Sequence, residues 1–306
     1  MRDTSFSICK ALAIICVVLS HAGGPAWLTS FVFQFHVPVF FICAGYFFKT
    51  KYADEEKTFV VRRFRTLYLP FLRWSIFFLL VHNLWFYTGV LNEEFGNAAG
   101  GVLHPYNWHT FAQRLWSIVF NMSGYDEFIC GAFWFFRALL LSSLGFLLSY
   151  KLARKFIMRD DAKRIGWCIL FCGFALSLWL TSDGLRITGV SQGGYRELLG
   201  LTFMAVGFLF AQYKKDFSLK WYYGTVAFLL LVGLLFICPA SMAPRVSIGQ
   251  AFALPVAGTA GFVMLRTISS FVDSRTKLLR RALIYIGDRT LYARLGILPL
   301  LRIELV

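Results

Sequence analysis

Two ionisable residues bracket an otherwise apolar or small-residue segment near the start of the chain, KALAIICVVLSH, which begins at Lys10 and ends at His21. On an α-helix of ~100° per residue, eleven steps make about three turns plus roughly 20°, so both side chains share one face. At ~1.5 Å per residue they lie roughly 16 Å apart. A neutral imidazole can take a proton from a hydroxyl near physiological pH, so His21 could act as a general base in group transfer. The alternative is that both residues anchor the ends of a membrane helix.

Three more ionisable residues lie inside apolar stretches. His36 stands two residues before Pro38 in FQFHVPVFFICAGYFF, Arg73 follows a proline in RRFRTLYLPFLRW, and Arg137 lies in GAFWFFRALL. An ionisable group at membrane depth costs ~2.5–3.5 kcal/mol on insertion scales and marks a working site by default. His36 could meet His21 near one end of the bundle, or could bond a carbonyl freed beside Pro38.

A run of arginines precedes Arg73 in the same segment, namely Arg62, Arg63 and Arg65. Together with Arg73 and Arg137 they could form charge-assisted bonds to phosphates. A basic loop can equally be a solvated signal of membrane orientation.

The elements that must position these residues are membrane helices. The chain has 306 residues, 58% hydrophobic and 18% aromatic, with a mean hydropathy of +0.63. The net charge of +15 does not indicate nucleic acid, because the basic residues cluster in short loops between apolar segments. No ligand cluster has metal-site spacing, and the seven cysteines are predicted to be small apolar fillers.

Nine apolar stretches are long enough to cross a ~30 Å hydrocarbon core. We expect an all-α transmembrane bundle of about nine to ten spans, forming a single membrane-embedded domain over residues 1–306. The predicted spans are 5–22, 29–48, 67–90, 131–150, 166–181, 199–213, 221–238, 248–267 and 282–301.

The loops predict the orientation of this bundle. With a cytoplasmic N-terminus, the cytoplasmic segments are 1–10, 49–66, 151–165, 213–220 and 266–281. They hold 22 Lys and Arg residues, whereas the opposite segments hold four, which predicts that the N-terminus is inside. The first helix has no small-residue cleavage site and is expected to be retained. The outer segment 91–130 contains HPYNWHTFAQRLW, whose aromatic spacing is typical of an interfacial amphipathic helix.

At these residues the sequence resembles membrane acyltransferase family 3, multi-pass proteins that move acyl groups from acyl-coenzyme A to sugars and related acceptors. The family has a basic residue, ten residues and a histidine in its first helix, which match Lys10 to His21. Its F-H-x-P-x-F-F-x-x-x-G-Y-x-F pattern matches FHVPVFFICAGYFF. Its R-x-x-R-L-x-x-P pattern is similar to RRFRTLYLP, through Arg62, Arg65, Thr66, Leu67 and Pro70. FWFFRALL and YIGDRTLY are similar to the family's W-F-L-x-x-L-F and I-G-x-x-T-L-Y.

The chain departs from the family in three places. Ser7 stands where many members have Asp, and Lys10 stands where many have Arg. Lysine keeps the positive charge of arginine but cannot form two parallel hydrogen bonds to one anionic group. After YIGDRTLY the chain reads ARLGILPLLRIELV, without the further histidine usual in the family, so a truncated or divergent end is expected.

The resemblance implies an inner-membrane O-acyltransferase that moves an acyl group, expected to be acetyl, from acyl-coenzyme A to a hydroxyl of a cell-envelope sugar. His21 is the predicted general base, and His36 positions the substrate or shares the proton. Lys10, Arg65 and Arg73 are predicted to bind the donor. Arg137 is predicted to stabilise charge on the thioester oxygen. Acetyl-coenzyme A is expected as a donor substrate, with no tightly bound cofactor, and the partners are the glycan acceptor and the lipid bilayer.

Two other functions remain open at the level of sequence. A transporter or flippase would use the same charges to line a route for an anionic or glycan substrate, and predicts interrupted helices in two related halves. A non-catalytic membrane partner derived from such enzymes is the other. The sequence does not identify the acceptor, the acyl chain or the oligomeric state.

Overall fold

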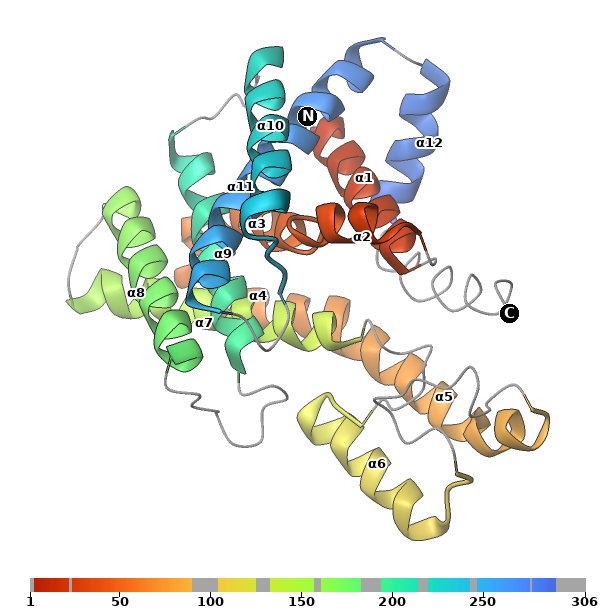
Figure 1. Cartoon of the computed structure of the whole chain (residues 1–306). Helices are drawn as coiled ribbons and strands as arrows, with labels where there is room; N and C mark the ends of the chain where they lie inside the picture. The colour runs from red at the N-terminus through yellow and green to blue at the C-terminus, as the bar shows by residue number, and fades with distance from the viewer. Residues whose placement is uncertain are drawn as a thin grey trace.

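The computed structural model of the chain describes residues 3–21, 24–89, 104–124, 133–156, 161–182, 194–213, 220–242, 247–275 and 277–289, and every regular element within them is helical. The prediction of an all-α protein is therefore confirmed for these residues (Figure 1). The α-helices are α1 (Thr4–His21), α2 (Ala26–Phe33), α3 (Pro38–Tyr46), α4 (Glu56–Arg63), α5 (Leu69–Tyr87), α6 (Trp108–Asn121), α7 (Trp134–Phe156), α8 (Ala162–Ser182), α9 (Tyr195–Tyr213), α10 (Trp221–Ile237), α11 (Ile248–Arg275) and α12 (Lys277–Asp288).

Several described stretches are suited to a membrane. Five are long and apolar enough to cross one, and two shorter helices are also apolar. The long ones are Ala26–Tyr46, Glu56–Tyr87, Trp134–Phe156, Ala162–Leu180 and Ile248–Ser274, and the short ones are Thr4–Ser20 and Trp221–Ile237. The predicted span 199–213 lies within α9, and 282–301 begins in α12 and continues outside the described residues. The total of nine to ten spans and the cytoplasmic N-terminus stay predictions.

The second predicted span is two helices instead of one. α2 ends at Phe33 and α3 begins at Pro38, with a turn between them. Proline has no N–H to donate and its ring clashes with the preceding turn, so the helix breaks here. The turn contains His36, which is thereby held at the start of α3.

The helix that follows contains one π-helical turn. It occupies Phe64–Tyr68, between α4 and α5, just before Pro70. Such turns insert one residue into a helix and are frequent at functional sites. The predicted boundary between a cytoplasmic loop (49–66) and a span (67–90) therefore falls inside a continuous helical stretch.

The centre of the bundle is a close contact between α3 and α9, which Figure 1 shows crossing near the middle of the molecule. Gly45 of α3 touches the backbone of Met204, and Gly207 of α9 touches the backbone of Ile42. A Cβ on either glycine would overlap the opposing backbone. Small residues allow such an approach between membrane helices, so this contact fixes α3 and the residues it carries.

The start of α1 is fastened by polar side chains of α11 and α12. The Ser7 hydroxyl donates to Oδ1 of Asp288 at 2.8 Å, and Arg266 forms an ion pair with Asp3 at 3.5 Å. Arg266 was expected in the cytoplasmic loop 266–281, but α11 continues through it and buries its side chain. These contacts fix the helix that carries Lys10.

The amphipathic segment predicted in the outer loop is helix α6. The Asn107 side chain caps it by accepting a hydrogen bond from the backbone N–H of Thr110 at 2.8 Å. Trp108, Trp116 and Phe120 are largely exposed, at 81%, 63% and 63%. Figure 1 shows α5 and α6 extending together away from the helices around α3. The helix is confirmed, and its location at the membrane interface stays a prediction.

Candidate functional site

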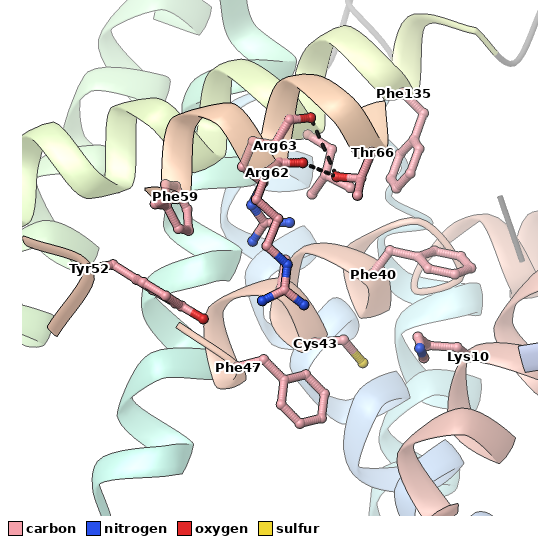
Figure 2. A pocket seen from close by; sticks show the side chains of 12 residues that line it. Lys10, Phe40, Cys43, Phe47, Tyr52, Phe59, Arg62, Arg63, Thr66 and Phe135 are labelled. Carbon is pink, nitrogen blue, oxygen red and sulfur yellow. Dashed lines mark hydrogen bonds between the residues drawn. The ribbon is translucent and has the colours of Figure 1, made fainter. Parts of the chain in front are cut away.

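A cavity of about 370 Å³ lies among residues of α1, α3, α4 and α7 (Figure 2). Small-molecule sites have volumes of roughly 300–1,000 Å³, so this cavity can hold part of a cofactor-sized ligand. Three cationic residues line it, Lys10, Arg62 and Arg63, and none of its lining residues in the described part of the chain is acidic. The site therefore favours an anionic ligand.

Aromatic side chains form much of the remaining wall. They are Phe40, Phe47, Tyr52, Phe59 and Phe135. In Figure 2 the Arg62 and Arg63 side chains project between these rings, and the Arg63 guanidinium lies 5.0 Å from the centre of the Phe59 ring. The cavity thus offers charge-assisted bonds beside flat apolar surfaces.

The wall that carries Tyr52 is connected to α7 by two ion pairs. Arg154 donates to both carboxylate oxygens of Asp54, and Lys151 contacts Glu56. The hydrogen bond from Arg154 holds the pKa of Asp54 below its ordinary value. Both pairs are solvent-exposed, so they position this segment more than they stabilise the fold.

Lys10 and His21 lie on the same helix, as predicted. Lys10 is half-buried on α1 and lines the cavity. His21 is the last residue of α1, and its side chain lies outside the described part of the structure. The spacing of eleven residues within one α-helix holds, and the role of His21 stays a prediction.

His36 is buried beside the start of α3 and is not among the residues that line the cavity. Its Nδ1 lies 2.6 Å from the carbonyl oxygen of Val32, which also accepts the backbone N–H of Phe35 and of His36 itself. A carbonyl can only accept, so Nδ1 carries the proton and Nε2 of the neutral ring is the basic nitrogen. His36 therefore bonds a carbonyl in the last turn of α2, but that carbonyl already accepts two backbone N–H groups and is not one freed by the proline. The contact also sets the tautomer that a proton acceptor needs.

Arg137 is buried on α7 and is held by a carboxylate. Its Nε and a terminal nitrogen each lie 2.9 Å from Oε1 of Glu197 on α9. Ser142 donates to the backbone carbonyl of Glu197 at 2.7 Å, which ties the same two helices together. Arg137 does not line the cavity. Its position is set by Glu197, and a role at the thioester oxygen stays a prediction.

Arg65 and Arg73 are placed differently from the other predicted donor residues. Both are exposed, and neither lines the cavity. The structure brings Lys10 together with Arg62 and Arg63, which the sequence had offered as phosphate ligands or as a topology signal. A role of Arg65 and Arg73 in donor binding stays a prediction.

Three residues at or near these sites were missed by the sequence analysis. Glu197 was excluded because the span was started at residue 199, although an acid beside an apolar span is the signal used for the other candidates. Tyr52 and Cys43 line the cavity through tertiary packing, for which the sequence contains no periodic signal.

The structure thus defines a helical membrane protein with a cationic cavity beside its first helix. Comparison with protein families identifies it further: the model of the acyltransferase domain matches residues 3–292. The chain belongs to the acyltransferase 3 family over nearly its whole length, and is a membrane acyltransferase. Comparisons with the curated proteins and with the solved structures found no match.

Proposed function

We propose that this acyltransferase moves an acyl group, most simply acetyl, from acyl-coenzyme A to a hydroxyl of a cell-envelope sugar at the inner membrane. The observation that carries the proposal is the cavity in which Lys10, Arg62 and Arg63 meet among aromatic walls. A coenzyme A thioester combines phosphates with an adenine ring and an extended amide arm. Guanidinium groups suit the phosphates, and aromatic rings suit the ring and the arm.

The donor is expected to enter from the cytoplasm. The excess of Lys and Arg in loops on one side supports a cytoplasmic N-terminus, and in that orientation α4 and the start of α1 lie toward the cytoplasm. Lys10 then steadies the donor arm, and the thioester is directed along α1 toward its far end. The part of the donor that exceeds the cavity lies within reach of exposed groups such as Arg65 and Arg73.

His21 is proposed to remove the proton of the acceptor hydroxyl as the oxygen attacks the thioester carbonyl. The carbonyl–sulfur bond breaks, the acyl group passes to the oxygen, and coenzyme A leaves as its thiol. His36 is proposed to position the acceptor or to share the proton through Nε2. Arg137, oriented by Glu197, is proposed to stabilise the negative charge that develops on the thioester oxygen.

Acetyl transfer in isolated membranes tests the proposal. Membranes with equal amounts of wild type, His21→Ala or His109→Ala receive acetyl-coenzyme A carrying a radiolabelled acetyl group. Label in envelope glycans should fall about 10²–10⁴-fold in His21→Ala, the usual contribution of a general base. It should be unchanged in His109→Ala, whose exposed histidine lies on α6.

Equal incorporation by wild type and His21→Ala would remove His21 from the chemistry. If no variant incorporates acetyl, the same membranes are tested with longer acyl-coenzyme A donors. A lack of transfer from all of them would reject coenzyme A thioesters as the donor class.

A further inference from the structure

Two cysteines from different helices meet at the wall of the cavity. Cys9 of α1 and Cys43 of α3 lie close enough for their side chains to interact, where the two helices contact each other. Both are buried, with 0% and 3% of the residue exposed. Their helices are separated by a turn and a further helix in the sequence, so a bond between the two sulfurs would cross-link the fold.

The two thiols differ in access. Cys43 lines the cavity, whereas Cys9 is not among the lining residues. Figure 2 shows the Cys43 side chain between those of Arg62 and Lys10, and both of these cations line the same cavity. Positive charge in this wall attracts an anionic reagent toward Cys43. Cys43 is thus the member of the pair that faces the cavity.

We propose that Cys43 is a modification site for small anionic disulfides, and that Cys9 is its resolving thiol. The cationic cavity attracts the anionic disulfide RS–SR. The Cys43 thiolate attacks one sulfur, forms a mixed disulfide and releases RS⁻. Cys9 then gives its proton to the released RS⁻ and attacks the Cys43 sulfur, which forms the Cys9–Cys43 disulfide and releases the second RS⁻. The incoming disulfide is reduced to two thiols while the protein pair is oxidised by two electrons.

A second cysteine pair provides a matched comparison. Cys168 and Cys172 also contact each other, but they lie one turn apart on α8 and outside the cavity. Residues at this spacing have Cβ atoms ≈ 5–6 Å apart, whereas a disulfide needs ≈ 3.5–4.5 Å. This pair should acquire adducts at most and should not close into a disulfide.

The experiment uses the purified full-length protein in detergent, with oxidised glutathione as the anionic disulfide. Alkylation followed by peptide mass spectrometry identifies the state of each cysteine. In the wild type we expect a Cys9–Cys43 cross-link, with the loss of two hydrogen atoms from the pair, reversed by a dithiol reductant. In Cys9→Ser the reaction should stop at glutathione bound to Cys43. In Cys43→Ser, Cys9 should stay unmodified.

The cavity's charge is tested with a neutral disulfide of similar size. Replacing Arg62 and Arg63 together by Gln should slow the reaction of Cys43 with oxidised glutathione about tenfold, in line with electrostatic focusing. The same variant should react with the neutral disulfide at the wild-type rate. Neither readout requires the acyl donor, so failure here and failure of the proposed acyl transfer are separate results.

Three results would overturn the inference. The first is that Cys9 in the Cys43→Ser variant is modified as fast as Cys43 is in the Cys9→Ser variant. Another is an unreactive Cys43 under conditions that modify the exposed Cys172. The third is an equal effect of the arginine substitutions on both disulfides.

Discussion

Oε1 of Glu197 lies 2.9 Å from two nitrogens of Arg137, and this ion pair is buried between α7 and α9. Removing one partner of a buried pair leaves an uncompensated charge and typically costs about 3–5 kcal/mol. Glu197→Ala should therefore lower the melting temperature of the detergent-solubilised protein markedly, as measured by loss of its gel-filtration peak after heating.

The paired variant Arg137→Met, Glu197→Leu separates stability from chemistry. Replacement of both charges by apolar residues of similar volume is often neutral for stability. This variant should recover most of the melting temperature lost in Glu197→Ala but remain inactive in acyl transfer. An active paired variant would show that Arg137 serves only to join the two helices.

The arginines of the cavity should determine the affinity for the donor. Charge-assisted hydrogen bonds contribute about 1.5–3 kcal/mol each, so loss of one corresponds to roughly a 10–100-fold change in affinity. Arg62→Gln, Arg63→Gln should raise the KM for acyl-coenzyme A by at least the lower figure. The control is Arg65→Gln, Arg73→Gln, which changes two exposed residues outside the cavity. A larger effect in the control would place the donor phosphates outside the cavity.

His36 can be tested with a substitution that keeps its contact with Val32. In His36→Asn the side-chain amide can donate to the Val32 carbonyl, as Nδ1 does at 2.6 Å, but it has no basic ring nitrogen. We expect a melting temperature close to that of the wild type and a large fall in kcat. Full activity of this variant would show that His36 only stabilises the turn before α3.

The ion pair between Asp54 and Arg154 should act on donor binding through the wall that carries Tyr52. Asp54→Asn is expected to raise the donor KM about two- to threefold, the scale of an exposed pair, and the exchange Asp54→Arg, Arg154→Asp should restore it. Lys51→Gln is the control, because Lys51 pairs with Glu55 of the same segment and does not reach α7. If both Asp54→Asn and the exchanged pair have the wild-type KM, the segment that carries Tyr52 does not position the donor.

The pH dependence of this contact follows from the lowered pKa of Asp54. A carboxyl whose folded-state pKa is depressed contributes stability above its ordinary pKa and loses it as the pH falls through the folded value. The pair therefore stays intact throughout the neutral range. Any change in KM between pH 6 and 8 should persist in Asp54→Asn, as a pH series on both proteins would show.

Hydropathy predicted the helices well because length and apolar composition are local properties. The span predicted over 29–48 corresponds to the apolar stretch Ala26–Tyr46, but its break into two helices was not predicted, although Pro38 is a local signal for one. Lys10 was selected by its spacing from His21 and by the family resemblance, and it does line the cavity. The ion pair of Arg137 could not be predicted, since it depends on how α7 meets α9 across 60 residues of sequence. The contact of Cys9 with Cys43 is of the same tertiary kind.

The placement of Arg73 has a more specific cause. In a regular helix Arg62 and Arg73 are eleven residues apart and share a face, as Lys10 and His21 do. The π-helical turn at Phe64–Tyr68 lies between the two arginines and adds one residue to that interval. The extra residue rotates everything after it by ~100°, so Arg73 does not line the cavity as Arg62 does.

The same turn gives α5 a choice between two registers. Deletion of one residue between Phe64 and Tyr68 would convert the turn to regular α-helix and leave the faces of α5 where they are, because the lost residue and the tighter turn rotate the helix in opposite directions by ~100° each. If the turn tightened to regular α-helix at constant length, α5 would instead rotate by ~100° and bring Arg73 onto the face of Arg62. A change in this one turn would therefore alter which side chains of α5 face the cavity without any substitution.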